Sequence, residues 1–97
     1  MELIGKKVLV RAHSAGLYYC TLKAVEGRTV TLTTARNIWR WSGANTIMEL
    51  SVKGAKNRSN CRFSIYVEEV VILDACQIIP CTGEAVKNIE SVEPWEY

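Results

Sequence analysis

The sequence predicts a mainly β fold with two short helices, built as a small and partly open barrel. Two observations support this. Five or six short stretches alternate apolar and polar residues with the period of two that strands require. Of the 97 residues, 48% are hydrophobic, which is enough for one core without disulfides or metal. No linker or repeat divides the chain, so residues 1–97 are predicted to form a single domain.

The first predicted strand covers residues 6–12, where β-branched residues are frequent. Its alternation would point Val8 and Val10 into the core. A turn at residues 13–16 would then reverse the chain.

A tight hairpin is predicted between a second strand at residues 17–25 and a third at residues 28–34. Glu26 and Gly27 would form its two-residue connection, because glycine readily adopts the positive φ that such turns need. One face of the second strand would carry Tyr18, Cys20, Leu22 and Ala24, and the other face Tyr19, Thr21 and Lys23. Residues 35–41 would either continue the third strand or follow it after a bend.

A short helix is predicted at residues 46–53. Thr46 and Glu49 have the spacing of a capping box, and Gly54 suits the position just past the helix end. Residues 54–60 would form an exposed, mobile and basic loop, because they include no apolar residue larger than alanine.

Three further strands are predicted in the second half of the chain. They are expected at residues 61–67, 70–73 and 75–80. Phe63, Ile65 and Val67 would share one face of the first of them. Glu68–Glu69 would form a turn or a strand end, and Pro80 would stop the last strand.

A C-terminal helix is predicted from Thr82 onward, and Pro94 would end it. Ala85, Ile89 and Val92 are spaced to form one buried stripe on this helix. A helix inserted after the third of five or six strands suggests a small barrel. The strongly bent, hairpin-rich beginning is typical of an SH3-like or Sm-like barrel, and we prefer that architecture to a sandwich.

Charge is distributed unevenly along the chain. Residues 1–62 carry eleven Lys or Arg and three Glu, whereas residues 63–97 carry one Lys and seven Asp or Glu. A basic and an acidic surface are therefore expected unless the fold interleaves the two halves. The asymmetry fits an anionic partner, self-association between opposite faces, or simply an uneven solvated surface.

The sequence shows neither a membrane segment nor a signal peptide. No apolar run approaches the roughly 20 residues of a membrane span, and the chain starts directly with a strand pattern. A cytoplasmic location is therefore expected, with reduced cysteines. Their spacing contains no Cys-x2-Cys pair and suits small apolar core residues better than zinc ligands. The four are Cys20, Cys61, Cys76 and Cys81.

No catalytic constellation is recognisable in the sequence. His13 is the only histidine, and acid–base or nucleophilic catalysis needs a base positioned next to its partner. Glu68 and Glu69 are adjacent and would point to opposite faces of a strand. The segment Ser42-Gly43-Ala44 lacks the second glycine and the Lys-Ser/Thr of a phosphate loop. The sequence thus predicts a protein that is not an enzyme and needs no cofactor or metal.

A binding surface is predicted around residues 33–41, which hold two of the three tryptophans and two arginines. In a strand, Trp39 and Trp41 would share one face and Arg40 would lie on the other. Indoles offer flat apolar area, arginine a planar cation, and asparagine a bidentate amide. The candidate ligand-binding residues are Arg11, His13, Arg36, Asn37, Trp39, Arg40 and Trp41. In the alternative interpretation, the two indoles fill the core and Arg40 is merely solvated.

Several segments resemble a known family. They are Gly5-Lys6-Lys7-Val8-Leu9-Val10-Arg11, Ser14-Ala15-Gly16, Thr33-Thr34-Ala35-Arg36, Ile38-Trp39-Arg40-Trp41-Ser42-Gly43 and Ile78-Ile79-Pro80-Cys81-Thr82. Over roughly residues 5–90 the chain resembles a family of small uncharacterised proteins of tailed-phage genomes, most specifically in its Ala-Arg-x-x-Trp-x-Trp-Ser-Gly segment. The resemblance implies synthesis inside an infected bacterial cell and an accessory role, and it transfers no residue role.

Three functions remain open. The first is a sponge that sequesters a cyclic nucleotide immune signal in counter-defence, as a homo-oligomer that encloses the signal between subunits. Its tryptophans would wall the pocket, its arginines would meet phosphate, and Asn37 and His13 would read polar groups. The second is a nucleic-acid-binding small barrel, whose affinity would fall steeply with salt. The third is a protein-binding inhibitor or virion accessory component that uses the same aromatic patch.

Overall fold

The computed structural model describes residues 2–97, in which the chain forms six strands and two helices. The strands are β1 (Lys7–Ala12), β2 (Gly16–Glu26), β3 (Thr29–Arg40), β4 (Arg62–Phe63), β5 (Val67–Ile72) and β6 (Ala75–Pro80). The helices are α1 (Ile47–Lys53) and α2 (Gly83–Glu90), and a short 3-10 turn covers Arg58–Asn60. The predicted mainly β fold, with one helix after the third strand and another near the C-terminal end, is confirmed.

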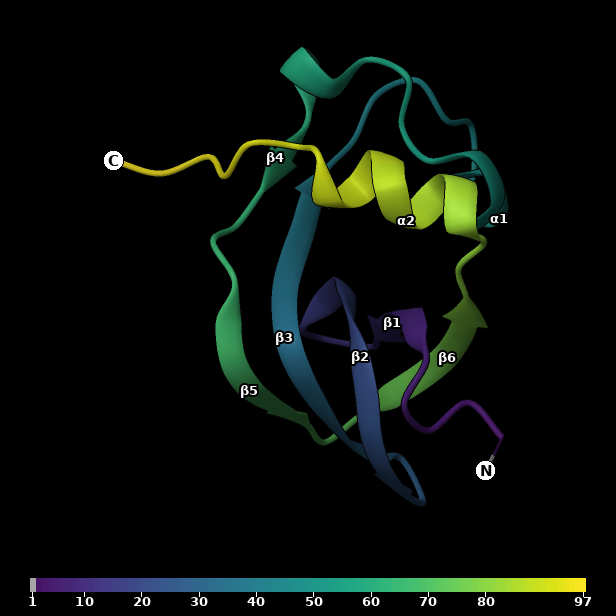
Figure 1. The fold of residues 1–97 in the computed structure, drawn as a ribbon. Coiled ribbons are helices and arrows are strands. Elements are labelled where there is room, and N and C mark those ends of the chain that lie inside the picture. Colours follow the sequence, from purple (N-terminus) through teal and green to yellow (C-terminus); the bar gives the residue numbers. More distant parts are fainter. Residues whose placement is uncertain (1) are drawn as a thin grey trace.

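The strands form one antiparallel sheet in the order β4-β3-β2-β1-β6, and β5 also pairs with β3. The strand β3 is long enough to pair with β5 along its first half and with β4 near its end. The strands β5 and β6 lie at opposite edges of the sheet, yet only Leu73 and Asp74 connect them. The sheet therefore curls on itself, and between the described edges it stays an open barrel (Figure 1).

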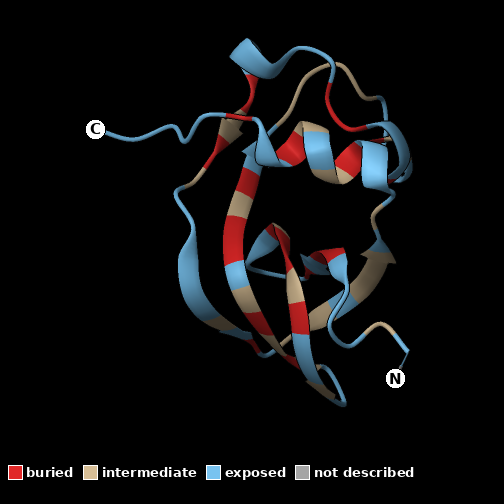
Figure 2. Cartoon of the chain, in the orientation of Figure 1, coloured by how far each residue is buried: buried red, intermediate tan, exposed pale blue. Residues whose placement is uncertain are grey.

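The buried residues form two core clusters, and Figure 2 shows buried stretches along β2, β3 and α2. One cluster is made by strand residues alone: Val8, Val10, Ala12, Cys20, Leu22, Val30, Leu32, Ala35 and Ile72. The other lies where the sheet meets the helices and contains Leu9, Leu17, Tyr19, Ile38, Leu50, Ala55, Cys61, Phe63, Ala85, Ile89 and Val92. Because strand side chains alternate, β1 contributes to both clusters. The inward orientation of Val8 and Val10 is confirmed, and Leu9 is buried on the opposite face.

The predicted hairpin between β2 and β3 is confirmed, with its turn one residue later than expected. Gly27, with a φ of 63°, and Arg28 form the turn, and Glu26 pairs with Thr29. The third strand continues to residue 40 after an irregularity at Thr34, which has a φ of 45°. A positive φ is unusual for a β-branched residue, so Thr34 marks a real bend within the strand.

The short helix α1 begins and ends where its capping residues predict. The Oγ1 atom of Thr46 accepts a hydrogen bond from the backbone N–H of Glu49 at 3.1 Å. The Glu49 carboxylate accepts one from the N–H of Asn45 at 2.6 Å. At the other end, the N–H of Gly54 donates to the carbonyl of Leu50. These contacts satisfy backbone groups that a helix end leaves unpaired.

The loop predicted at residues 54–60 begins later than expected. Ala55 is buried in the helical core, and Asn88 of α2 accepts from its N–H at 2.7 Å and donates to its carbonyl at 2.8 Å. Residues 56–60 are exposed, as predicted. The sequence near Ala55 gives no sign of these two hydrogen bonds, since Asn88 lies 33 positions further along the chain.

The single strand predicted at residues 61–67 is wrong. The strand β4 ends at Phe63, and residues 64–66 separate it from β5. The hydroxyl of Ser64 accepts from the N–H of Asn37 at 2.8 Å, and its own N–H donates to the Asn37 carbonyl at 2.9 Å. Phe63, before this contact, is buried, whereas Ile65, after it, is exposed.

The acidic second half of the chain interleaves with the basic first half. Glu68 and Glu69 lie inside β5, so the prediction of a turn or a strand end there is wrong. Glu69 pairs with Lys23 of β2 at 3.1 Å, and Glu90 of α2 pairs with Lys7 of β1 at 2.5 Å. The fold therefore brings acidic residues of the second half beside basic residues of the first half and does not separate them onto two surfaces.

The C-terminal helix α2 buries its predicted stripe against the sheet, because Ala85, Ile89 and Val92 are all buried. It ends at Glu90, with Ser91 as its C-cap, so the prediction that Pro94 ends the helix is wrong by several residues. The hydroxyl of Tyr19 in β2 donates to the carboxylate of Glu90 at 2.6 Å and links the helix to the strand layer. Among the described helices, none is long and apolar enough to cross a membrane.

Candidate functional site

A cleft of about 650 Å³ lies between the β1–β2 turn, the end of β3 and the start of α1. We call it the tryptophan cleft. Its lining consists of Arg11, Ala12, His13, Ser14, Ala15, Gly16, Leu17, Asn37, Ile38, Trp39, Trp41 and Ile47. Five of the seven predicted site residues meet there, namely Arg11, His13, Asn37, Trp39 and Trp41. The hairpin fold brings residues 11–17 beside residues 37–41, which are distant in sequence.

The two indoles of the cleft differ in burial. Trp39, the second-last residue of β3, is 60% exposed. Trp41 follows the strand and packs, partly buried, against the helical core. Both border the same cleft, as the alternation of side chains predicted, although the strand itself ends at residue 40. The alternative in which both indoles fill the core is wrong for Trp39.

One wall of the cleft is the β1–β2 turn, and Asp74 anchors it. The backbone N–H and the hydroxyl of Ser14 donate to the Asp74 carboxylate at 2.9 and 2.5 Å. The N–H of His13 donates to the Asp74 carbonyl at 3.0 Å. Sequence reasoning missed Asp74, because it lies 60 positions after Ser14 and no local pattern connects the two.

The opposite wall is fixed to the same turn by Asn37. Its side-chain NH₂ donates to the carbonyls of Leu17 at 3.2 Å and Ala15 at 3.5 Å. Gly16 lies at this contact with a φ of 87°, a conformation that favours glycine. No hydrogen bond within residues 2–97 occupies the side-chain oxygen of Asn37, so this oxygen is free to accept a donor from a ligand.

Acidification is expected to release the turn from its anchor. The hydrogen bonds from the Ser14 hydroxyl and N–H hold the pKa of the Asp74 carboxyl below its usual range. A carboxyl group whose pKa is lower in the folded state than in the unfolded state stabilises the protein at every pH above its unfolded-state pKa. This stabilisation is lost as the pH falls through the folded-state pKa. We therefore expect Asp74→Asn to lower the melting temperature at neutral pH, and this deficit to shrink below about pH 4. Melting curves of both proteins from pH 7 to pH 2 measure it; a deficit independent of pH would contradict the charge-based anchor.

The lining of the tryptophan cleft offers groups that can stack on a ligand or form hydrogen bonds with it. Arg11 is the one charged side chain among the described residues that line it, and the rest offer indole surface, amide and hydroxyl groups. Burial raises the pKa of the Cys20 thiol to about 12 and that of Cys81 to about 11, so neither is a thiolate at neutral pH. Within residues 2–97, no three His, Cys, Asp or Glu side chains gather as a metal site would require.

The prediction that Arg36 contacts a ligand phosphate needs correction, because this residue lies inside the protein and is 1% exposed. Its Nε donates to the carbonyl of Ser64 at 3.1 Å, and one terminal nitrogen donates to the carbonyls of Ile89 and Val92 at 3.1 and 3.0 Å. The guanidinium also lies 4.5 Å from the ring centre of Tyr66. Arg36 therefore joins β3 to the C-terminal end of α2, where the backbone carbonyls of a helix end favour a cation.

Arg40 also lies outside the tryptophan cleft. It is exposed and pairs in register with Arg62 of β4. The guanidinium of Arg62 in turn lies 3.7 Å from the ring centre of Trp95. Arg40, predicted to lie opposite the tryptophans, is thus the cross-strand neighbour of another arginine and does not line the cleft.

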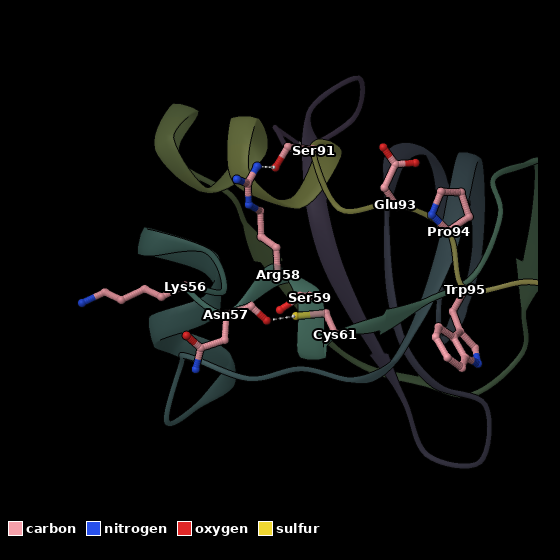
Figure 3. A pocket seen from close by; sticks show the side chains of 9 residues that line it. All are labelled: Lys56, Asn57, Arg58, Ser59, Cys61, Ser91, Glu93, Pro94 and Trp95. Atoms are coloured by element: carbon pink, nitrogen blue, oxygen red, sulfur yellow. Dashed lines mark hydrogen bonds between the residues drawn. The ribbon is translucent and has the colours of Figure 1, made fainter.

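A second hollow, of about 660 Å³, lies between the 3-10 turn and the segment after α2. Lys56 and Arg58 border it together with the acidic Glu93, and Arg58 donates to the hydroxyl of Ser91 at 2.9 Å (Figure 3). None of the predicted site residues lines this hollow. The tryptophan cleft, where aromatic and cationic groups converge without a carboxylate, is therefore the candidate site.

Comparison with known proteins gives a family and no function. A family described as a domain of unknown function, DUF6948, matches residues 5–89, and the chain belongs to it. No curated protein and no solved structure matches the chain. The function therefore has to be argued from the site itself.

Proposed function

We propose that this member of the DUF6948 family binds a nucleotide-type ligand in the tryptophan cleft and sequesters it without chemical conversion. The observation that carries the proposal is the arrangement of Trp39, Trp41, Arg11 and Asn37 around one hollow of about 650 Å³. Clefts of this size commonly hold small ligands and cofactors.

Each of these groups matches one part of a nucleotide. An exposed indole can stack a base of any sequence, and Trp39 offers that surface. A guanidinium pairs with phosphate oxygens through parallel hydrogen bonds, which is the role we assign to Arg11. The free side-chain oxygen of Asn37 can accept from an amino or ribose hydroxyl group, because hydrogen bonds to the turn already fix the amide.

The biological role that we propose is counter-defence inside a phage-infected bacterial cell, with a cyclic nucleotide immune signal as the ligand. The proposal of a phage origin rests on the resemblance of the Ala-Arg-x-x-Trp-x-Trp-Ser-Gly segment. A second copy of the chain covering the open cleft would enclose such a ligand more fully, so we propose a homo-oligomer.

Two other functions have support in particular observations. The exposed indoles of Trp39 and Trp95 would also suit a protein partner, because aromatic residues dominate binding energy at interfaces. Lys56 and Arg58 on the second hollow would suit the phosphates of a nucleic acid. The nucleotide proposal is preferred because the tryptophan cleft combines aromatic, cationic and amide groups in one hollow.

Thermal denaturation with a ligand panel tests the proposal. The panel contains cyclic dinucleotides, cyclic trinucleotides, ordinary nucleotides and short oligonucleotides, each at low and high salt. A ligand that binds only the folded state raises the melting temperature, and we expect one class of nucleotide to do so at both salt concentrations. Arg11→Gln should reduce the shift, whereas Arg28→Gln, the same change in the exposed hairpin turn, should leave it intact.

The panel also separates the alternatives. A shift with oligonucleotides only, lost at high salt, would favour nucleic-acid binding. The absence of any shift would contradict the nucleotide proposal and favour a protein partner.

A further inference from the structure

We infer that the ligand carries two planar rings, as a dinucleotide does, and that its second ring binds between Trp39 and Trp95. This inference rests on the proposed function of the tryptophan cleft and adds the class of ligand. Trp39 borders two hollows at once: the cleft itself and a smaller hollow of about 300 Å³. The smaller hollow is lined by Trp39, Trp95, Glu96 and Tyr97.

The shared indole makes the two hollows neighbours. A single ring stacked in the tryptophan cleft would leave the smaller hollow empty and its two indoles exposed, Trp39 by 60% and Trp95 by 55%. Exposed aromatic surface of this extent is typical of binding sites. A ligand with two rings joined by a short linker would use both hollows, and each ring would contact Trp39.

The structure holds Trp95 in position before any ligand binds. Its backbone N–H donates to the carbonyl of Phe63 at 2.8 Å, and the preceding residue, Pro94, forms a bridge with Phe63. The guanidinium of Arg62 lies 3.7 Å from the centre of its ring and does not line the hollow. Two indoles from segments more than fifty residues apart are thus fixed around one hollow, which reduces the entropy cost of binding a flat ring between them.

The charges of the two hollows differ in the way that a dinucleotide requires. Arg11 in the tryptophan cleft suits a phosphate, whereas Glu96 would repel one from the smaller hollow. A carboxylate accepts hydrogen bonds from the N–H groups of a base, and guanine presents two neighbouring ones. The second ring should therefore be an uncharged base with N–H donors, and the linking phosphate should lie toward Arg11.

Isothermal titration with GMP, AMP and the linear dinucleotides pGpG and pApA tests the inference. We expect at least one dinucleotide to bind about tenfold more tightly than its mononucleotide, because one further stacked base contributes that much or more. Trp95→Ala should remove this advantage and leave mononucleotide affinity unchanged. Glu96→Gln should weaken pGpG more than pApA. Val71, an exposed apolar residue of β5, lines neither hollow, so Val71→Ala is the matched control and should change neither affinity.

The outcomes distinguish this inference from the proposed function. Equal affinities for dinucleotides and mononucleotides, or a Trp95→Ala protein that keeps the dinucleotide advantage, would overturn the two-ring inference while the nucleotide function stands. Failure of all four linear probes to bind the unaltered protein would also overturn the two-ring inference, and the nucleotide function would then be decided by the thermal panel with its cyclic nucleotides. Urea denaturation of the Trp95→Ala protein confirms that any loss of affinity reflects the missing indole, because a folded variant gives a normal cooperative transition.

Discussion

Replacing Arg36 with methionine is expected to lower the free energy of unfolding by about 3 kcal/mol or more, although the substitution removes no apolar group from the core. The buried guanidinium donates to the carbonyls of Ser64, Ile89 and Val92. Methionine fills similar volume but cannot donate, so the carbonyls of Ser64 and Val92 lose this donor, whereas that of Ile89 keeps the backbone N–H of Val92. Each buried carbonyl left unpaired costs about 1–3 kcal/mol. Removing a buried charge recovers some desolvation energy, but the unpaired carbonyls remain and outweigh it. Urea denaturation measures the difference.

Arg40→Met is the matched control, since it is the same substitution four residues further along β3. Arg40 is exposed and lies opposite Arg62, so its loss should change stability by less than about 0.5 kcal/mol or relieve a like-charge contact. Equal stabilities of the Arg36→Met and Arg40→Met proteins would show that the hydrogen bonds of Arg36 contribute little to the fold.

The parts of the fold that the sequence predicted correctly depend on local chemistry. Helix α1 needs Thr46, Glu49 and Gly54, and all three lie within eight residues of one another. The β2–β3 hairpin similarly depends on Gly27 and on the alternation at either side of it. Such elements can be read from a single segment, because their stabilising contacts join neighbours in the chain.

The errors occur where distant residues decide the local conformation. The strand predicted at residues 61–67 has the right alternation, yet it stops at Phe63, where Ser64 pairs with Asn37, 27 residues earlier. Arginine is a residue type that often binds phosphate, so the sequence favoured a ligand-binding role for Arg36. Its role is structural because it donates hydrogen bonds to the distant carbonyls of Ile89 and Val92. Periodicity cannot reveal either contact, since each depends on the packing of α2 or β4 against β3.

The candidate site was predictable to the extent that it lies on one strand. Trp39, Trp41 and Asn37 were identified by composition and occupy the cleft because they border the same end of β3. The contribution of Trp95 was not predictable, because its position depends on a backbone hydrogen bond to Phe63. Sequence patterns thus indicate which residue types are suited to binding, and the packing of distant segments decides which of them meet.

Trp39→Ala is expected to weaken nucleotide binding by about tenfold to a hundredfold, while the free energy of unfolding changes little. The reason is the 60% exposure of Trp39, which leaves little buried area to lose on truncation. Trp41→Ala should behave differently, because its indole packs against the helical core and its loss should cost about 2 kcal/mol of stability. Tryptophan fluorescence titration and urea denaturation of both variants measure the two quantities.

The contrast between the two variants separates binding from packing. A Trp39→Ala protein that unfolds would mean that this indole is part of the core after all, and the tryptophan cleft would lose its stacking wall. A folded Trp39→Ala protein with unchanged affinity would mean that the ligand binds elsewhere. Only loss of affinity with retained stability fits an exposed indole that is held beside Arg11 and Asn37 for a ligand, because neither the fold nor the core gains from leaving it in water.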